Sequence, residues 1–292
     1  MLTKPQVDAL MASSASKLES MRASIRNHGS ALVAFSGGVD STFVLKIAVE
    51  ELGENAVALM ALSASVAPEE EAEAAELAKK IGARFITVRS NELENPDYQK
   101  NATNRCYYCK SELYTLCDQK KAELGVAAIL DGFNADDTKD HRPGHQAARE
   151  HAVRSPLAIA GLTKNEIRAW SQHLGLPTWD KPQMACLASR IPYGTSVTAD
   201  RLMLIGRAET AIRELGLRTF RVRYHNDIAR LEVSAEEYAK ASTEEFRTAA
   251  SSALKALGFA FVVLDLEPFR SGRMNEAAGV GKKDVVSLPV LS

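Results

Sequence analysis

The chain has 292 residues, of which 46% are hydrophobic and 25% charged, and this ordinary globular composition excludes intrinsic disorder and collagen-like structure. The length suits one large domain or two modest ones. Lys and Arg number 36 against 37 Asp and Glu, and the resulting net charge of −1 argues against a protein that coats nucleic acid.

The sequence carries no membrane or secretory signal. No run reaches the roughly 18 uninterrupted apolar residues that a spanning helix needs, and the first residues lack the apolar centre of a signal peptide. The 4 cysteines are too few for a disulfide scaffold of this size. We therefore expect a soluble, cytoplasmic protein that does not contact membranes.

Short apolar runs alternate with segments of helical periodicity through residues 3–174. The runs predict buried strands and the periodic segments predict helices, with Gly53 and Gly82 as helix stops. This alternation predicts βαβ units and a parallel sheet covered on both faces, which is an α/β fold. The expected strands are 31–35, 55–63, 84–88 and 126–130, and the expected helices are 3–28, 42–52, 68–81, 105–124 and 164–174.

The pattern changes after a proline-containing stretch over 178–198, which we interpret as a boundary loop. The expected elements beyond it are a helix over 201–215, a hairpin of strands 219–224 and 228–233, a helix near 235–257 and a strand over 259–266. We therefore predict a first domain over 1–195, a smaller α+β domain for substrate binding and oligomerisation over 196–275, and a mobile tail over 276–292.

The hexapeptide Ser36-Gly37-Gly38-Val39-Asp40-Ser41 lies between a predicted strand and a predicted helix. Two glycines let the backbone approach a ligand closely, and free N–H groups at a helix start favour phosphate. Ser36 and Ser41 add hydroxyl donors. Asp40 would repel phosphate, so we interpret it as a ligand of Mg²⁺ that bridges the phosphates. A serine-capped glycine turn is the alternative.

SGGVDS after the first strand resembles the signature of the PP-loop ATP pyrophosphatases, which have an adenine nucleotide alpha hydrolase-like fold. These enzymes cleave ATP between the α- and β-phosphates and adenylate an oxygen of the substrate. The segment DGFNADD, over 131–137, resembles their second element, with an Asx-rich turn as the alternative. The resemblance implies ATP and Mg²⁺ as cofactors. It assigns ATP binding to Ser36, Gly37, Gly38, Asp40, Ser41, Ser63, Gly132 and Asn134.

Three of the four cysteines stand in motifs. Cys106 and Cys109 form a CxxC pair in RCYYCK, and Cys186 lies in ACLASR. A lone CxxC occurs in redox, zinc and iron–sulfur sites. Two cysteines three apart on a helical turn can hold one ion or cluster, and Cys186 is the candidate for a further ligand. Cys117 matches no motif, so we expect a buried helix residue.

RCYYCKSELY, DGFNADD, HRPG, SPLAIAGLTKNEIR, GLPTWDKP and ACLASRIPYGT occur in this order. Together they resemble the LarE family, the ATP-dependent sulfur transferases of nickel-pincer nucleotide cofactor synthesis, from about Leu32 to Arg273. The resemblance implies that the carboxylates of pyridinium-3,5-biscarboxylic acid mononucleotide are adenylated with loss of pyrophosphate. A sulfur nucleophile then displaces AMP and leaves a thiocarboxylate.

The family uses two sulfur sources. In one form a single cysteine, at the position of Cys186, gives up its own sulfur. In the other form three cysteines bind a 4Fe-4S cluster whose free iron carries an extra sulfide. Because Cys106 and Cys109 are present, we expect the cluster form, with Cys106, Cys109 and Cys186 as ligands. The alternative, in which Cys186 acts alone and the CxxC is incidental or binds zinc, stays open.

Arginines gather after the boundary loop, and Arg221 and Arg223 share one face of a predicted strand. Arg forks suit phosphate and carboxylate. A solvated strand face with ordinary salt bridges is the alternative for each of them. The resemblance implies substrate binding by Ser189, Arg190, Arg221, Arg223 and Arg270. It implies catalytic roles for Cys186, Asp40, Glu209 and Glu232.

Three other functions stay open. A tRNA thiolase of the same superfamily is disfavoured by the near-neutral charge. A ligase similar to NAD synthetase leaves the cysteines unexplained, and the intact SGGVDS argues against a non-catalytic iron–sulfur or ATP-sensing protein. The resemblance further implies a small-molecule nucleotide substrate, a homo-oligomer of hexameric form, no nucleic acid, and a partner that delivers sulfide.

Overall fold

A computed structural model describes residues 3–64, 66, 68–139, 143–182, 186–270, 273, 276 and 279. The chain divides into two compact units. The large unit comprises Met1–Tyr98 and Asn104–Cys186, and the small unit comprises Gln99–Thr103 and Leu187–Ser292.

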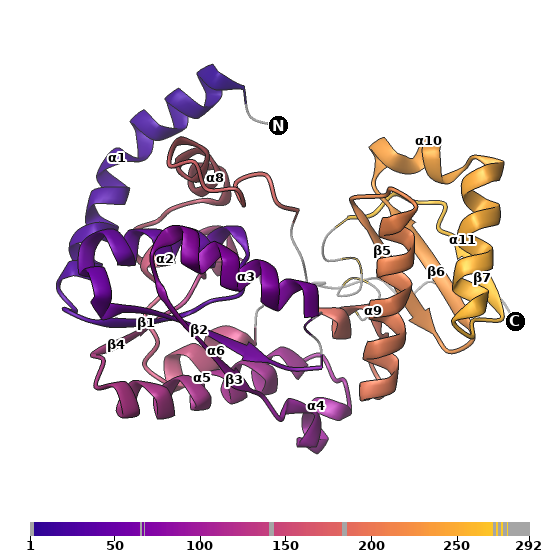
Figure 1. Cartoon of the computed structure of the whole chain (residues 1–292), viewed down its shortest axis with the longest axis horizontal. Helices are drawn as coiled ribbons and strands as arrows, with labels where there is room; N and C mark the ends of the chain where they lie inside the picture. Colours follow the sequence, from indigo (N-terminus) through magenta and orange to yellow (C-terminus); the bar gives the residue numbers. More distant parts are fainter. Residues whose placement is uncertain are drawn as a thin grey trace, which may run out of the picture. The chain divides into compact units, whose positions relative to one another are not determined.

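A four-stranded parallel sheet of order β3-β2-β1-β4 forms the centre of the large unit (Figure 1). Its strands are β1 (Ala31–Ala34), β2 (Ala56–Leu62), β3 (Arg84–Arg89) and β4 (Ala128–Leu130). Ala31 lies opposite Ala56 on one side and Ala128 on the other. All four residues of β1 are buried because helices cover both faces of the sheet.

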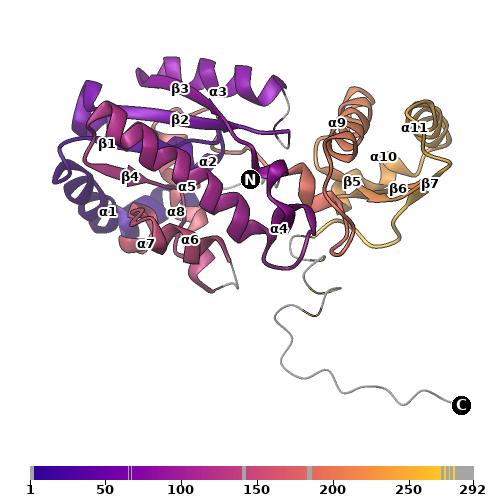
Figure 2. The ribbon, with the colours of Figure 1, turned by 90° about the horizontal axis from the view of Figure 1, so that it is seen from below.

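Helices form a layer on each side of this sheet (Figures 1 and 2). Successive side chains of β1 point to opposite faces, so Val33 packs in the core with α2, whereas Leu32 packs against Tyr114 and Cys117 of α5. One layer contains α1 (Lys4–Arg26), α2 (Val39–Leu52), α3 (Pro68–Ile81) and α8 (Lys164–His173). The other contains α5 (Arg105–Leu124) and α6 (Gly144–Glu150).

The predicted alternation of strands and helices is confirmed, and with it the α/β class. α3 and α5 begin and end at the predicted residues. α2 begins at Val39 rather than at residue 42, because extended Gly38 precedes it, so Asp40 and Ser41 lie in its first turn. Three short helices, α4 (Pro96–Gln99), α6 and α7 (Pro156–Ile159), were not predicted, because they are too short to show an apolar period.

The small unit contains a three-stranded sheet of order β5-β6-β7. β5 (Phe220–His225) and β6 (Ile228–Val233) form the predicted antiparallel hairpin, and β7 (Phe261–Leu264) pairs in parallel with β6. α9 (Ala199–Glu214) and α11 (Glu244–Ala256) lie on the same face of this sheet (Figure 2).

The prediction of one helix near 235–257 is wrong. The segment contains a 3₁₀ turn (Ala235–Glu237), α10 (Tyr238–Ala241) and then α11. The break occurs because the hydroxyl of Thr243 accepts a hydrogen bond from the backbone N–H of Phe246 and caps a new helix.

The segment Gln99–Thr103 is held within the small unit by Asn101. The buried Asn101 amide donates to the carbonyl oxygens of Ile191, Pro192 and Thr195 at 3.2, 2.8 and 2.9 Å. The third and last crossing between the units follows Cys186, whereas the predicted boundary follows residue 195. The predicted mobile tail over 276–292 lies outside the described residues, apart from Glu276 and Gly279.

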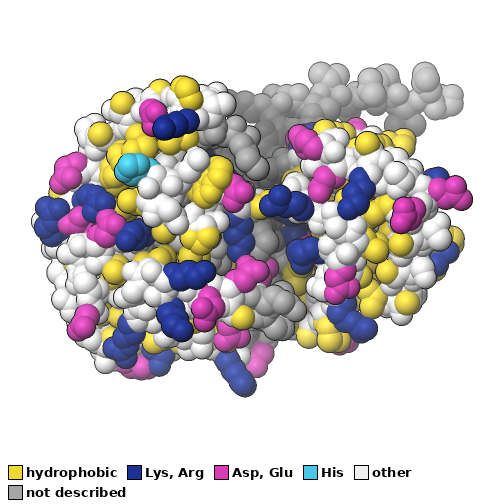
Figure 3. Space-filling view, turned by 45° about the horizontal axis from the view of Figure 1, so that its top comes forward, with side chains coloured by type: hydrophobic (Ala, Val, Ile, Leu, Met, Phe, Trp, Pro, Cys, Tyr) yellow, Lys and Arg dark blue, Asp and Glu magenta, His cyan; other side chains and the backbone are white. Residues whose placement is uncertain are grey.

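Charges of both signs are mixed on the face that Figure 3 shows, in agreement with the net charge of −1. Within the described ranges, no helix combines the length and the apolar character needed to cross a bilayer.

Candidate active site

A cavity of about 620 Å³ lies at the carboxyl ends of the parallel strands in the large unit. Residues that follow each of the four strands line it: Phe35, Ser63, Ser90 and Asp131. In open α/β sheets ligands bind at this edge, where the strand order reverses, here between β1 and β4. The volume lies in the range of small-molecule sites.

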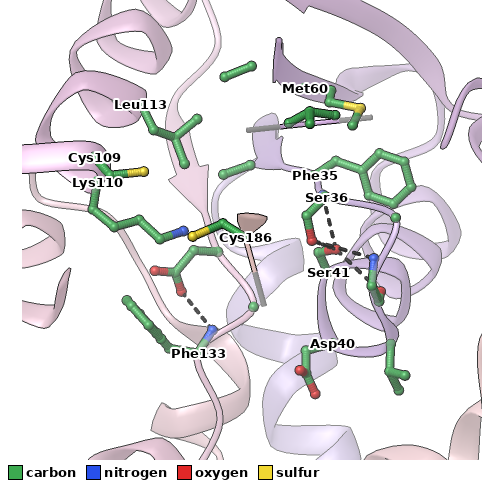
Figure 4. Close-up of a pocket in the computed structure, with 18 of the residues that line it drawn as sticks. Phe35, Ser36, Asp40, Ser41, Met60, Cys109, Lys110, Leu113, Phe133 and Cys186 are labelled. Atoms are coloured by element: carbon green, nitrogen blue, oxygen red, sulfur yellow. Dashed lines mark hydrogen bonds between the residues drawn. The ribbon is translucent and has the colours of Figure 1, made fainter. Parts of the chain in front are cut away.

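The predicted phosphate loop lies at the wall of this cavity (Figure 4). The Ser41 hydroxyl accepts a hydrogen bond from the Ser36 backbone N–H at 3.2 Å and lies 3.1 Å from the Ser36 hydroxyl. Gly37 has φ +66°, a left-handed conformation that glycine adopts without strain. The start of α2 therefore faces the cavity with its free N–H groups, as anion binding requires.

Asp40 and Lys164 form an ion pair at the cavity, with Asp40 Oδ2 and Lys164 Nζ 2.5 Å apart. The other Asp40 oxygen, Oδ1, is buried and has no hydrogen-bond partner among the described residues. Burial raises the pKa of this carboxyl, and the Lys164 ammonium counteracts part of that rise. A buried carboxylate oxygen with unused acceptor capacity fits the predicted role as a Mg²⁺ ligand.

Gly132, which follows β4, packs directly on the start of α2. A Cβ at this position would lie 2.9 Å from the backbone nitrogen of Ser41 and 3.2 Å from Cβ of Asp40. Both neighbours belong to the segment that shapes the phosphate loop. The structure thus gives Gly132 a packing role that positions Asp40 and Ser41.

Gly132→Ala is expected to lower any ATP turnover at this site about tenfold or more, because displacing the first turn of α2 misaligns the loop. Gly206→Ala is the matched control, since its Cβ would meet only Leu187 Cδ1 at 3.4 Å, an ordinary contact. Pyrophosphate release, measured for both variants, checks the prediction. Equal rates for the two variants would contradict it.

Asn134 organises the DGFNADD segment. Its side-chain oxygen accepts hydrogen bonds from the backbone N–H groups of Asp136 and Asp137 at 2.9 and 3.4 Å. The segment is therefore an Asx-type turn, and it lines the cavity as well. Asp136 in turn accepts from the backbone N–H of Lys164 at 2.8 Å, which joins the turn to the start of α8.

Two of the predicted sulfur-site cysteines, Cys109 and Cys186, line the same cavity as the phosphate loop (Figure 4). Burial raises the pKa of the Cys109 thiol, and its hydrogen bond to Glu92 adds to that rise. Cys106 lies one turn before Cys109 on α5 and is exposed.

Among the residues that the structure describes, no three Cys, His, Asp or Glu side chains form a metal-binding group. The ligand set of Cys106, Cys109 and Cys186 is thus not assembled in this structure, and it stays a prediction. Cys117 is fully buried in α5, and burial raises its pKa to about 12, which confirms the expected core position.

Lys110, Phe133 and Glu92 line the cavity but were not singled out from the sequence. The Lys110 ammonium lies 5.7 Å from the ring centroid of Phe133, in cation–π contact. Phe133 stacks on His145, with ring centroids 4.1 Å apart. Lys110 directly follows the CxxC pair and Phe133 belongs to DGFNADD, so the motifs themselves contained the signal. Lys164 lies within SPLAIAGLTKNEIR, so this motif contained the signal for Lys164 as well.

All five predicted substrate-binding residues lie in the small unit, and four of them form one cluster with the predicted catalytic glutamates. Arg190 forms a two-pronged pair with Glu209, from Nε to Oε1 at 2.7 Å and from Nη2 to Oε2 at 2.8 Å. Arg190 also donates to the Ser189 hydroxyl at 3.0 Å. Glu209 accepts from the backbone N–H of Val222 at 3.1 Å, which joins α9 to β5.

Arg221 and Arg223 lie beside this pair on β5. Arg223 donates to Glu232 Oε2 and to the Ser189 carbonyl, each at 2.8 Å. Arg221 donates to the Phe220 carbonyl at 2.7 Å and lies 4.8 Å from the ring centroid of Phe269. Burial lowers the pKa of Arg221 to about 10, so this side chain stays charged at neutral pH.

This buried cluster contains more positive than negative charge. Arg190, Arg221 and Arg223 are 3%, 8% and 6% exposed, and the buried carboxylates beside them are Glu209 and Glu232. Among the residues that the structure describes, these three cations against two anions leave an excess of one positive charge, which suits an anionic ligand. The alternative of a solvated strand face is wrong for Arg221 and Arg223.

Arg270 differs from the other predicted arginines. Its side chain is 53% exposed and pairs with Glu276. The side chains that extend the buried cluster at its edge are instead Arg230 and Arg273, both of which pair with Asp265. Sequence spacing could not reveal these ion pairs, because Asp265 reaches Arg230 only through the parallel pairing of β7 with β6.

Comparisons with known proteins cover both units. The NAD synthase family matches residues 14–105, which include the phosphate loop. An uncharacterized protein of Synechocystis sp. is 45% identical over 260 residues, which cover 89% of this chain and 97% of that protein. The pyridinium-3,5-bisthiocarboxylic acid mononucleotide synthase of Lactiplantibacillus plantarum is 39% identical over 267 residues, which cover 91% and 96%. An uncharacterized protein of Methanocaldococcus jannaschii is 25% identical over 240 residues, which cover 82% and 90%.

Proposed function

The chain belongs to the LarE family, that of pyridinium-3,5-bisthiocarboxylic acid mononucleotide synthase, and from this premise we propose that it converts the carboxylates of pyridinium-3,5-biscarboxylic acid mononucleotide to thiocarboxylates at the expense of ATP. The observation that carries the proposal is one cavity lined by both a phosphate-binding type of loop and two thiols, Cys109 and Cys186. The product belongs to nickel-pincer nucleotide cofactor synthesis.

The chemistry needs an activated carboxylate, since a free carboxylate is a poor acyl acceptor. A carboxylate oxygen attacks the α-phosphorus of ATP, and pyrophosphate leaves. A sulfur nucleophile then attacks the acyl carbon of the adenylate, and AMP leaves with the oxygen. The N–H groups at the start of α2, with Ser36 and Ser41, hold the phosphates in place during the first transfer.

Asp40 is the proposed Mg²⁺ ligand, supported by the unused acceptor Oδ1 at the cavity. When bound, Mg²⁺ would neutralise charge on the departing pyrophosphate. Lys164 holds the other oxygen and fixes the orientation of the carboxylate.

Asp40→Asn is expected to lower pyrophosphate release about 100-fold, because an amide keeps the shape but loses the negative charge that binds the cation. The measurement is the rate of pyrophosphate release at saturating ATP across a range of Mg²⁺ concentrations. Asp180→Asn, outside the cavity residues, serves as the control. A wild-type rate in Asp40→Asn would reject its role.

We propose a 4Fe-4S cluster on Cys106, Cys109 and Cys186 as the source of sulfur. Two of these cysteines line one cavity and the third lies one helical turn away, which supports the proposal in part. Three thiolates leave one iron of a cubane open, and that iron would supply a sulfide. Iron and acid-labile sulfide per chain, measured after purification without oxygen, distinguish this source from Cys186 as its own sulfur donor.

The substrate's anionic groups are proposed to bind at the small-unit arginines. The excess positive charge of Arg190, Arg221 and Arg223 over Glu209 and Glu232 supports this assignment. Ser189 contacts two of these arginines through its hydroxyl and its carbonyl. Arg270 is retained as a proposed substrate ligand from the family resemblance alone, and its exposed position distinguishes it from the buried set.

The decisive test of the function is product analysis. Purified protein, ATP, Mg²⁺ and pyridinium-3,5-biscarboxylic acid mononucleotide should yield AMP, pyrophosphate and a product in which sulfur replaces carboxylate oxygen, visible by mass spectrometry. Pyrophosphate release with tRNA in place of the mononucleotide, together with a thiolated nucleoside, would instead favour the tRNA thiolase.

Three further features are proposed from the family resemblance: a cytoplasmic location, a homo-oligomer of hexameric form and a partner that delivers sulfide. Size-exclusion chromatography with light scattering measures the oligomeric state.

A further inference from the structure

Lys181 lines the same cavity as the phosphate loop, and the proposed steps of the reaction do not involve its side chain. Its ammonium pairs with Glu73 of α3 at 3.0 Å. Glu73 precedes Ala74, which is the residue that a Cβ on Gly37 would contact at 3.4 Å. The resting position of the Lys181 ammonium is therefore on the turn of α3 that packs against the phosphate loop.

The backbone that presents Lys181 is held firmly by α8. Arg168 donates from Nη1 to the Trp179 carbonyl at 2.5 Å and from Nη2 to the Lys181 carbonyl at 2.8 Å. The Lys181 N–H also donates to the Thr178 carbonyl at 3.0 Å. The peptide groups around Lys181 are thus fixed, while its side chain is held by an acidic partner at the surface.

The ion pair between Lys181 and Glu73 is weaker than the contacts that hold the other two lysines of the cavity. Glu73 is 64% exposed, and a surface pair of this kind adds little stability. Lys164, by contrast, pairs with Asp40, whose side chain is only 21% exposed, and Lys110 lies over the rings of Tyr114 and Phe133. Among these three lysines, Lys181 can change its partner at the lowest cost.

We propose that Lys181 binds the β- and γ-phosphates of ATP, and so the pyrophosphate that leaves, and that Glu73 holds its ammonium between turnovers. The inference rests on the proposed use of ATP at this cavity. A triphosphate carries more negative charge than one carboxylate, so the Lys181 ammonium exchanges Glu73 for phosphate oxygens when the nucleotide binds. Arg168 acts as a positioning residue through the two carbonyls that it holds.

The test measures binding of three ligands by calorimetry: the non-hydrolysable analogue α,β-methylene-ATP with Mg²⁺, inorganic pyrophosphate with Mg²⁺, and AMP. Lys181→Met is expected to weaken binding of the analogue and of pyrophosphate about tenfold and to leave AMP affinity unchanged. Lys181→Arg should restore most of the loss. Glu73→Gln should tighten pyrophosphate binding, because the competing carboxylate is gone. Lys80→Met, an exposed lysine on the same helix, is the matched control.

The outcomes separate this inference from the proposed function. Equal weakening of AMP and of the analogue in Lys181→Met would show a merely structural role and overturn the inference. Unchanged affinity for all three ligands would overturn it as well. A wild-type protein that binds neither the analogue nor AMP would overturn the proposed function itself.

Discussion

Cys186→Ser is expected to abolish thiocarboxylate formation while pyrophosphate release continues at a rate close to that of the wild type. The serine side chain has nearly the same shape, so the cavity and the phosphate loop stay intact. A hydroxyl has no sulfur to donate, and it is a much poorer ligand of iron than a thiolate. Mass spectrometry of the product and a pyrophosphate assay, both without oxygen, measure the two half-reactions separately.

Two further cysteine variants are needed to explain the result for Cys186→Ser. Cys117→Ala should keep sulfur transfer, because Cys117 is fully buried in the core of α5. A double variant, Cys106→Ser with Cys109→Ser, separates the two sulfur sources. Loss of iron and of transfer in the double variant supports a cluster, whereas full transfer would reject it. Thiocarboxylate formation by Cys186→Ser would contradict both.

Glu209→Ala is expected to destabilise the small unit by about 3–5 kcal/mol. The side chains of Arg190 and Glu209 are 4% and 7% exposed, so the substitution leaves a buried guanidinium without its two-pronged partner. It also removes the acceptor for the Val222 N–H. Hydrogen exchange along β5, followed by mass spectrometry, reports on this unit directly, whereas both tryptophans lie in the large unit.

The matched control for this prediction is Glu214→Ala, an exposed glutamate at the end of the same helix, with an expected change within about 0.5 kcal/mol. A second variant, Arg190→Met with Glu209→Leu, should recover part of the lost stability, since it removes both buried charges together. Equal protection of β5 in Glu209→Ala and Glu214→Ala would contradict the expectation.

Local signals in the sequence were sufficient to predict most of the helices and strands of the large unit. α3 begins at Pro68 and ends before Gly82, and α5 ends before Gly125 in a left-handed cap, so residues at their own ends delimit both helices. The phosphate loop was found the same way, because six consecutive residues form it. The Thr243 cap was visible too, but the apolar period continued across it and concealed the break.

The partners of the site residues could not be predicted, because they depend on contacts between distant segments. The alternation of side chains along β5 placed Arg221 and Arg223 on one face, but it did not indicate that Glu209 from α9 would reach Arg190. In the large unit, Lys164 meets Asp40 across 124 residues of chain. Burial of charged groups likewise follows from tertiary packing, which periodicity does not reveal.

The strap formed by Gln99–Thr103 has a consequence for how the protein is made. Asn101 precedes the carbonyl groups that it binds by 90 to 94 residues. At a synthesis rate of about 5 to 20 residues per second, the ribosome makes these acceptors about 5 to 20 seconds after Asn101. Meanwhile the strands of the large unit have all emerged. The small unit is therefore completed last, and a recombinant fragment that begins at Leu187 would lack the side chain that ties its first loop together.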